Sequence, residues 1–270
     1  MKHRLSKRFI YIVTLVGALL LFLTGCGKSS SNSSLQKIKN RGTLEVGMIS
    51  SNPPYEYQTT KKGKQVMDGS DVQLVKKVAK SLGVKYKIKT MDLDGLLPAL
   101  QAHKVDMLIT SMSPTPERKQ GAKFSNVYYK STNTLVVRKS DKIKYSNTDK
   151  FNNSTIAVVN NSTQQPMIKK AFPNATMKNL GKVTDLALAV NNGKADAFSI
   201  DVPTAKILLR QNPNLTMTSW KHHDSTAGAA IAFSKNASSD LVKKVNKIVA
   251  KNKNQYSNWV LEYAEKVPTN

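Results

Sequence analysis

A run of hydroxyl residues, a predicted helix start and an arginine follow one another between residues 110 and 118. Thr115 is a suitable N-cap and Pro116 suits the first helical position, so Arg118 falls in the opening turn of a short helix. The hydroxyl residues before this turn are Thr110, Ser111 and Ser113. A guanidinium, hydroxyls and the free backbone N–H groups of a helix start together form a site for a carboxylate. The alternative is that Arg118 pairs on the surface with Glu117 or Asp106.

The carboxylate of Asp201 follows a predicted strand at 195–200. It is a candidate cap for the helix that Pro203 begins, and also a candidate partner for a cation. A carboxylate site on one part of the molecule and an acid on another, facing one gap, are complementary to the two charges of a zwitterion. Further donors toward such a gap follow a predicted strand at 155–159, and these are Asn161, Ser162, Thr163 and Gln164. A structural helix cap also explains these four residues.

Two segments of the chain repeat the same pattern without gaps, residues 99–111 and residues 189–201. Each reads as a helix end, a tight turn at His103 or Gly193, and a strand that runs into a polar residue. The alternative is a chance match between two common turn patterns. In open α/β sheets, ligands bind at the carboxyl ends of strands, so Ser111 and Asp201 are expected at the site.

The elements that must position these residues alternate between short apolar runs and amphipathic stretches, which predicts an α/β fold. Strands are expected at 44–48, 84–89, 105–109, 155–159, 195–200 and 227–233. Helices are expected at 72–82, 94–102, 164–170, 183–192, 238–251 and 257–265, and another begins at Pro203. Gly83 is expected to end the helix at 72–82.

The N-terminus has the pattern of an export signal, because a basic start precedes the apolar run Phe9–Leu23, which is too short for a comfortable membrane span. The segment Leu23–Cys26 resembles the lipobox of bacterial lipoproteins, in which the cysteine is acylated and becomes the new N-terminus. Residues 1–25 are therefore predicted to be a signal peptide, and Ser-rich residues 26–34 a flexible tether. The alternative is an uncleaved anchor helix with a bystander thiol at Cys26, the only cysteine.

The formal net charge of +25 raises the question of a nucleic-acid partner. The lysines are scattered from Lys28 to Lys266 without an arginine-rich cluster, so we expect no nucleic-acid binding but a solvated basic face near an anionic cell envelope. No metal site is expected, because His222 and His223 point in different directions in an extended segment and His103 is isolated in a turn.

Taken together, a set of short motifs in order along the chain resembles the family 3 solute-binding proteins, the polar amino-acid receptors of ABC importers. The segments that support this resemblance are Leu44–Gly47, Asn52–Glu56, Gly69–Val72, Ser111–Ser113, Thr115–Arg118, Phe124–Ser125, Tyr128–Tyr129, Asn161–Gln164 and Gly193–Asp196. Each motif is weak alone, whereas the ordered set from about Leu35 to the end of the chain is highly specific.

The resemblance implies a periplasmic-binding-protein-like fold, with two α/β lobes joined by two hinge strands around a ligand cleft. Lobe 1 would comprise residues 35–132 and 227–270, and lobe 2 residues 133–226, with crossings near 131–135 and 226–231. Arg118 and Ser113 would hold the α-carboxylate of an amino acid, and Asp201 its α-ammonium. The assisting groups would be Ser111, Thr110 and the backbone near Thr163. The side-chain pocket would be lined by Asn52, Tyr55 and Leu93.

This sequence departs from the family pattern where Asn52 and Leu93 replace frequent aromatic residues, so the preference for a ligand side chain is not transferable. The resemblance further implies a permease with its own ATPase as partner, a monomeric receptor and no cofactor. A sensor or adhesin role remains an alternative. An enzyme of the same fold, such as a dehydratase, would need a positioned acid or base. Glu56 and Asp201 are the acidic candidates for that role.

Overall fold

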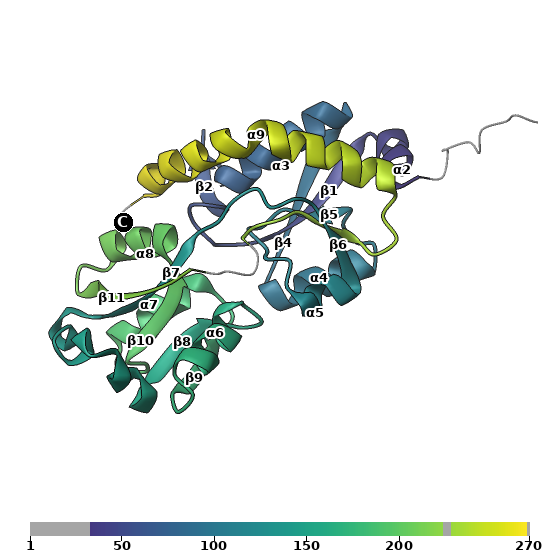
Figure 1. Ribbon diagram of the computed structural model, residues 1–270. Helices are drawn as coiled ribbons and strands as arrows, with labels where there is room; N and C mark the ends of the chain where they lie inside the picture. The colour runs from purple at the N-terminus through teal and green to yellow at the C-terminus, as the bar shows by residue number, and fades with distance from the viewer. Residues whose placement is uncertain (1–32, 224–227, 269–270) are drawn as a thin grey trace, which may run out of the picture.

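The computed structural model describes residues 33–223 and 228–268, which form two α/β lobes, each built on a five-stranded sheet (Figure 1). The predicted signal peptide, Cys26 and most of the predicted tether lie outside the described residues. None of the helices in the described part of the chain is long and apolar enough to cross a membrane.

The first lobe contains a sheet with the strand order β4-β1-β5-β12-β6. Its strands are β1 (Thr43–Ile49), β4 (Lys85–Met91), β5 (Met107–Leu108), β6 (Ala122–Phe124) and β12 (Ala232–Ser234). β1 pairs in parallel with β4 and β5, and β12 runs antiparallel to β5 and β6. The helices of this lobe are α2 (Ser34–Arg41), α3 (Ser70–Leu82), α4 (Leu93–Gln101), α5 (Pro116–Gly121) and α9 (Ser239–Lys266). A hairpin of β2 (Tyr57–Lys61) and β3 (Lys64–Asp68) precedes α3.

The second lobe contains a sheet with the strand order β11-β7-β10-β8-β9. Its strands are β7 (Thr132–Arg138), β8 (Thr155–Val159), β9 (Thr176–Leu180), β10 (Ala197–Asp201) and β11 (Leu215–His223). β8 pairs in parallel with β9 and β10, whereas β7 runs antiparallel to β10 and β11. The helices are α6 (Gln164–Ala171), α7 (Val183–Asn191) and α8 (Val202–Gln211), and 3₁₀ turns occupy residues 139–153.

Two crossing segments connect the lobes, and they pair with each other through an isolated bridge between Tyr129 and Ala229. Gly228 has φ +67°, and a Cβ atom there would lie 2.3 Å from the carbonyl oxygen of Tyr129. A residue without a side chain is therefore required at this close approach. The predicted strand at 227–233 is wrong in its extent, because β12 begins only at Ala232, after this bend.

The predicted internal repeat is confirmed at the level of individual hydrogen bonds. The N–H of Lys104 donates to the carbonyl of Ala99 at 2.9 Å, and the N–H of Lys194 donates to that of Ala189 at 2.8 Å. The two turns also have a left-handed residue at equivalent places, His103 (φ 55°) and Gly193 (φ 68°). Each lobe thus uses one helix-turn-strand unit that ends at the gap between the lobes.

The same repeat places one aspartate of each lobe in an equivalent structural role. The carboxylate of Asp106 accepts from the N–H of Glu45 at 2.7 Å, and that of Asp196 accepts from the N–H of Thr155 at 2.8 Å. Asp106 also pairs with Arg41. Asp106 is thus engaged by Arg41 and by the backbone of Glu45, and no ion pair between it and Arg118 is seen among the described residues.

Several predicted elements match closely, including β8, α6, α7 and the end of α3 at Gly83 (φ 73°). The two helices predicted at 238–251 and 257–265 are instead one helix, α9, of 28 residues. Within this helix the side-chain amide of Asn252 donates to the carbonyl of Ile248 at 2.7 Å, so the asparagine is satisfied there. The predicted strand at 105–109 is shortened to β5.

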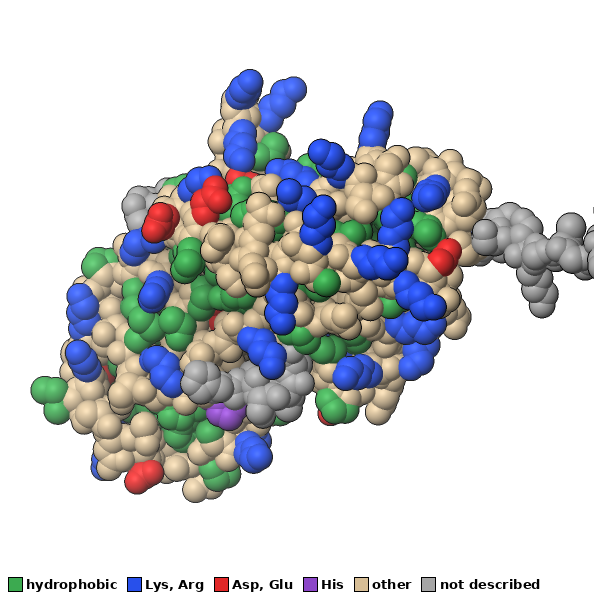
Figure 2. All heavy atoms as spheres, turned by 45° about the horizontal axis from the view of Figure 1, so that its top comes forward, with side chains coloured by type: hydrophobic (Ala, Val, Ile, Leu, Met, Phe, Trp, Pro, Cys, Tyr) green, Lys and Arg blue, Asp and Glu red, His purple; other side chains and the backbone are tan. Residues whose placement is uncertain are grey.

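The C-terminal helix α9 lies across one side of the first lobe and reaches α8 of the second (Figure 1). Ile207 of α8 is fully buried and belongs to the core cluster of the first lobe. Figure 2 shows this side of the molecule, with lysine and arginine side chains spread over it rather than gathered in one patch. The distribution agrees with the expected solvated basic face.

Candidate functional site

One cavity of about 110 Å³ lies between the lobes, and all ten residues predicted for the site line it. They are Asn52, Tyr55, Leu93, Thr110, Ser111, Ser113, Arg118, Ser162, Thr163 and Asp201. The first seven belong to the first lobe and the last three to the second. The site is therefore built by both lobes, at the carboxyl ends of strands that the repeat brings to a common gap.

Arg118 lies in the first turn of α5, where Thr115 is the N-cap and Pro116 the first helical residue, as predicted. The Thr115 hydroxyl accepts from the N–H of Arg118 at 3.3 Å. The Arg118 guanidinium donates to the carbonyl of Ser113 at 3.0 Å and, across the gap, to the carbonyl of Asn161 at 2.7 Å. Both hydrogen bonds orient the planar Arg118 guanidinium at the cavity wall, where it can bind a carboxylate.

Asp201 is the N-cap of α8 and also lines the cavity, so both roles considered for it are combined in one residue. Its carboxylate accepts from the N–H of Thr204 at 3.1 Å and from the Thr204 hydroxyl at 2.9 Å. The Tyr55 hydroxyl of the other lobe donates to it at 2.9 Å. Burial raises the pKa of Asp201, whereas the hydrogen bonds from Thr204 and Tyr55 oppose that rise. An ammonium group in the cavity would find a carboxylate already oriented from both lobes.

The hydroxyls of the first lobe are not equivalent. The Thr110 hydroxyl donates to the carboxyl of Glu56 at 2.5 Å and accepts from the N–H of Ile49 at 3.0 Å. The expectation that it assists a ligand carboxylate is therefore not supported by its geometry, because its proton is already donated. The Ser111 hydroxyl accepts from the side-chain amide of Asn52 at 3.0 Å and keeps its own proton for another acceptor.

Two further features of the cavity lining are typical of a binding site. Ser111 has φ 47°, a left-handed conformation that is sparsely populated for residues with a Cβ and is often found at functional sites. On the second lobe, the Ser162 hydroxyl is buried without a hydrogen-bond partner among the described residues. A buried polar atom that lines a cavity is a natural donor or acceptor for a bound molecule.

The walls for the rest of a ligand come mainly from uncharged residues, many of which sequence reasoning missed. The further lining residues are Ile49, Tyr129, Ser131, Asn133, Val159, Gln164, Val183, Ile200, Gly228 and Ala229. Leu93 packs against core clusters of both lobes. Gln164 donates to the side chain of Asn133 at 2.8 Å, which joins α6 to the crossing strand β7. Tyr129 belongs to the family motif Tyr128–Tyr129, and this motif could have indicated that Tyr129 lines the cavity.

Other candidates lie away from this cavity. Glu56 is completely buried behind Thr110 and does not line the cavity. Within residues 33–223 and 228–268, no group of three or more His, Cys, Asp or Glu is arranged to hold a metal ion. The His222 ring stacks on Trp220, with 5.9 Å between the ring centroids.

The sequence of residues 44–263 matches the family model of the bacterial extracellular solute-binding proteins, family 3. Among curated proteins, the chain is 33% identical to the arginine-binding extracellular protein ArtP of Bacillus subtilis, over 88% of this chain and 90% of that protein. It is 29% identical to a probable histidine-binding protein of Campylobacter jejuni, over 95% of this chain and 98% of that protein.

Solved structures agree with the sequence comparison. An amino acid ABC transporter substrate-binding protein from Streptococcus pneumoniae, crystallised with L-arginine, superposes with a TM-score of 0.82 at 29% identity, covering 87% of this chain and 98% of that one. The ancestral amino-acid-binding protein AncCDT-1, described as a precursor of cyclohexadienyl dehydratase, superposes with a TM-score of 0.74 at 28% identity, covering 87% and 98%. The chain therefore belongs to the bacterial extracellular solute-binding proteins, family 3.

Proposed function

We propose that this protein binds one free amino acid between its lobes and delivers it to an ABC importer. The observation that supports the proposal most strongly is the pair Arg118 and Asp201, which are oppositely charged, come from different lobes and line one cavity. The α-carboxylate of the ligand binds the Arg118 guanidinium with help from the Ser111 and Ser113 hydroxyls. The α-ammonium binds Asp201.

Closure of the two lobes follows from this arrangement. A ligand that touches both charges makes interactions in the closed form that the open form does not provide, and this difference in affinity shifts the population toward closure. The movement occurs at the crossing segments near Tyr129 and Ala229. A permease with its own ATPase then recognises the closed receptor and accepts the amino acid.

The proposal includes the position of the receptor in the cell. Acyl chains on Cys26 hold a monomeric receptor to the outer face of the cell membrane, and the tether predicted for residues 26–34 ends where α2 begins at Ser34. Lobe 1 comprises residues 35–132 and 227–270, and lobe 2 residues 133–226. Replacement of Cys26 by serine is expected to release the protein from the membrane fraction into the medium.

The ligand-binding proposal is tested by a thermal-shift screen of the twenty amino acids on protein that lacks residues 1–25. A ligand at a hundredfold its Kd adds about 2.7 kcal/mol to the free energy of unfolding. Arg118→Ala is expected to abolish every shift, because the carboxylate loses its cation. Lys119→Ala is the matched control, since it removes an exposed cation one residue away. Wild-type affinity in Arg118→Ala would contradict the assignment.

An enzyme of the same fold is the second candidate, because AncCDT-1 is described as a precursor of a dehydratase. Acid–base catalysis needs a group that reaches the reacting atoms. Glu56 lies behind Thr110, and Asp201 is held by Tyr55 and Thr204. The geometry therefore supports binding better. Mass spectrometry of ligand recovered after long incubation separates the two functions, since a receptor returns its ligand unchanged.

A further inference from the structure

A pair of carboxyl groups, Glu56 and Asp71, is completely buried beneath the cavity, and the function proposed above does not use either of them. Asp71 lies in the first turn of α3, and Glu56 follows the turn that begins at Asn52. An isolated ionised carboxylate is costly to bury, and two ionised carboxylates in contact are costlier still. The pair therefore requires protons, cations or many donors.

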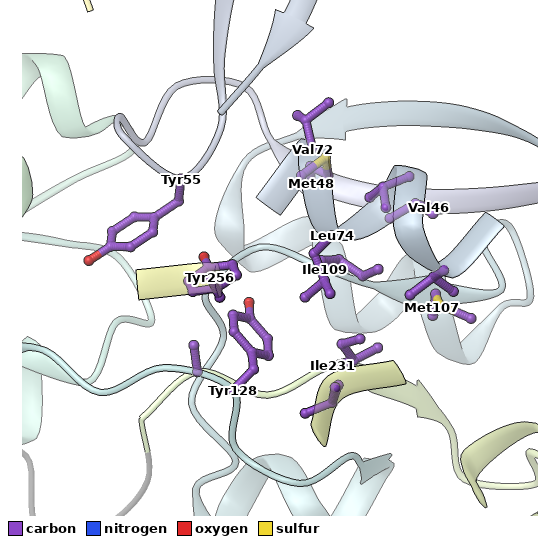
Figure 3. Close-up of a cluster of buried hydrophobic side chains, with 14 of the residues drawn as sticks. Val46, Met48, Tyr55, Val72, Leu74, Met107, Ile109, Tyr128, Ile231 and Tyr256 are labelled. Carbon is purple, nitrogen blue, oxygen red and sulfur yellow. The ribbon is translucent and has the colours of Figure 1, made fainter. Parts of the chain in front are cut away.

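The hydrogen bonds around Asp71 are those of an ionised carboxylate. Its Oδ1 accepts from the hydroxyls of Tyr128 at 2.9 Å and Tyr256 at 2.8 Å. Its Oδ2 accepts from the backbone N–H of Ser111 at 2.6 Å. Three donors converge on this one group, and the two tyrosine rings pack edge to face, 4.7 Å between centroids (Figure 3).

The surroundings of Glu56 are those of a neutral acid. Its Oε1 accepts from the Thr110 hydroxyl at 2.5 Å and from the side-chain amide of Asn52 at 3.5 Å. Its Oε2 is buried and receives no donor from the described residues. Glu56 and Asp71 are joined by a side-chain hydrogen bond, so this carboxyl oxygen is satisfied if it holds a proton and donates it to the carboxylate of Asp71.

Within the described residues, the titratable groups that surround Glu56 and Asp71 supply hydrogen-bond donors but no positive charge. The titratable neighbours are the phenols of Tyr128 and Tyr256, with Tyr55 and Tyr129 beyond them. Burial raises the pKa of each of these phenols, so they stay protonated and act as donors. Burial, followed by the charge of Asp71, likewise raises the pKa of Glu56.

We propose that Glu56 and Asp71 share one proton beneath the cavity, with the proton on Glu56, and that this pair positions Ser111 and Asn52 at the ligand cavity. Asp71 holds the backbone of Ser111 in its left-handed conformation, and Glu56 holds the Thr110 hydroxyl and the Asn52 amide. The positioning role rests on the proposed amino-acid binding, whereas the shared proton does not.

The shared proton is tested by stability against pH, with Glu56→Gln in the full chain purified in detergent. The glutamine amide donates and accepts as the neutral acid does but cannot ionise. Unfolded Glu has a pKa of about 4.3, so above that pH the folded wild type holds a proton that the unfolded chain releases. The measured quantity is the unfolding equilibrium constant of the wild type divided by that of Glu56→Gln. As the pH increases above about 4.3, this ratio should rise by up to about tenfold per pH unit. A flat or falling ratio overturns the proposal.

Two matched variants sharpen this test. Glu45→Gln removes a carboxylate on β1 that pairs with Lys89 at 3.0 Å, and it should keep the pH dependence of the wild type. Asp71→Asn replaces an acceptor of three donors by an amide, and it should lose more stability at neutral pH than Glu56→Gln. If Asp71→Asn is the tolerated variant, or Glu56→Gln does not fold, the assignment of the proton is wrong.

The positioning role is tested by calorimetric titration of each of the twenty amino acids near neutral pH. Glu56→Met has a side chain of similar length that offers no polar atom to Thr110 or Asn52. Its affinity should fall on the order of tenfold, the cost of an unsatisfied buried group, while Glu56→Gln stays near the wild type. Equal affinities of Glu56→Met and wild type overturn this role. Binding of no amino acid by the wild type counts against the proposed function and leaves the stability result in force.

Discussion

Tyr55 and Asp201 connect the two lobes directly, since the Tyr55 hydroxyl donates to Oδ1 of Asp201 at 2.9 Å. Oδ2 of Asp201 accepts from the Thr204 hydroxyl of its own lobe. The carboxylate that we propose for the ligand ammonium is thus oriented from both sides of the gap. The same hydrogen bond favours the closed arrangement of the lobes.

Replacement of Tyr55 by phenylalanine is expected to weaken amino-acid binding by about 0.5–1.5 kcal/mol, because one hydrogen bond of the closed form is lost. The measurement is the Kd from calorimetric titration. Tyr57→Phe is the matched control, since Tyr57 lies on β2 outside the cavity lining. An affinity loss of equal size in both variants would mean that the contact between Tyr55 and Asp201 does not contribute.

The affinity is expected to fall in acid, with Asp201 as the titrating group. Burial raises the pKa of Asp201, and protonation removes the charge that holds the ammonium. Below that pKa the Kd should therefore increase up to about tenfold per pH unit, because binding must release one proton. Asp201→Asn is expected to bind weakly at neutral pH and to show no such slope. A slope retained in Asp201→Asn would assign the acid effect to another group.

Leu93→Phe is expected to change which amino acid binds best. Leu93 lines the cavity and packs against clusters of both lobes, so a larger ring alters the space left for the ligand side chain. The ranking of the twenty amino acids by thermal shift measures the effect. Leu97→Phe on the same helix is the control, because Leu97 lines an adjoining groove but not the cavity itself. An unchanged ranking in Leu93→Phe would exclude this position from the specificity pocket.

Gly228→Ala is expected to destabilise the protein and weaken ligand binding. The new Cβ would lie 2.3 Å from the Tyr129 carbonyl, in a crossing segment that must keep its bend. Gly63→Ala is the matched control, since Gly63 has a similar φ of 73° with nothing within 4 Å of the added atom. It should cost only about 1–2 kcal/mol, the strain of a left-handed residue. Chemical denaturation of both variants measures the difference, and equal losses would contradict the steric argument.

The charged groups of the site were predictable because their signals are local. Thr115 and Pro116 mark a helix start, which fixes Arg118 in its first turn, and the repeat relates the end of β10 at Asp201 to Ser111. Arg118 and Asp201 are far apart in the sequence, but this separation did not prevent the prediction, because the α/β topology brings the carboxyl ends of strands together.

Other parts of the site had no local signal. Asn133 and Gly228 belong to the crossing segments, whose sequences carry no strong periodicity, and their place at the cavity depends on how the lobes meet. The helix α9 was predicted as two pieces because the asparagines at and after Asn252 lower helix propensity. Tertiary packing of Tyr256 and Trp259 overrides that local preference.

The last helix also touches the lobe that it does not belong to. The Arg210 guanidinium of α8 donates to the carbonyl oxygens of Ala264 and Val267, at the end of α9, and Ile207 packs into the first core. Any rotation of one lobe against the other must slide or break these contacts. The end of α9 is therefore expected to resist such a rotation, and a fluorophore attached there is expected to change its signal when the lobes move.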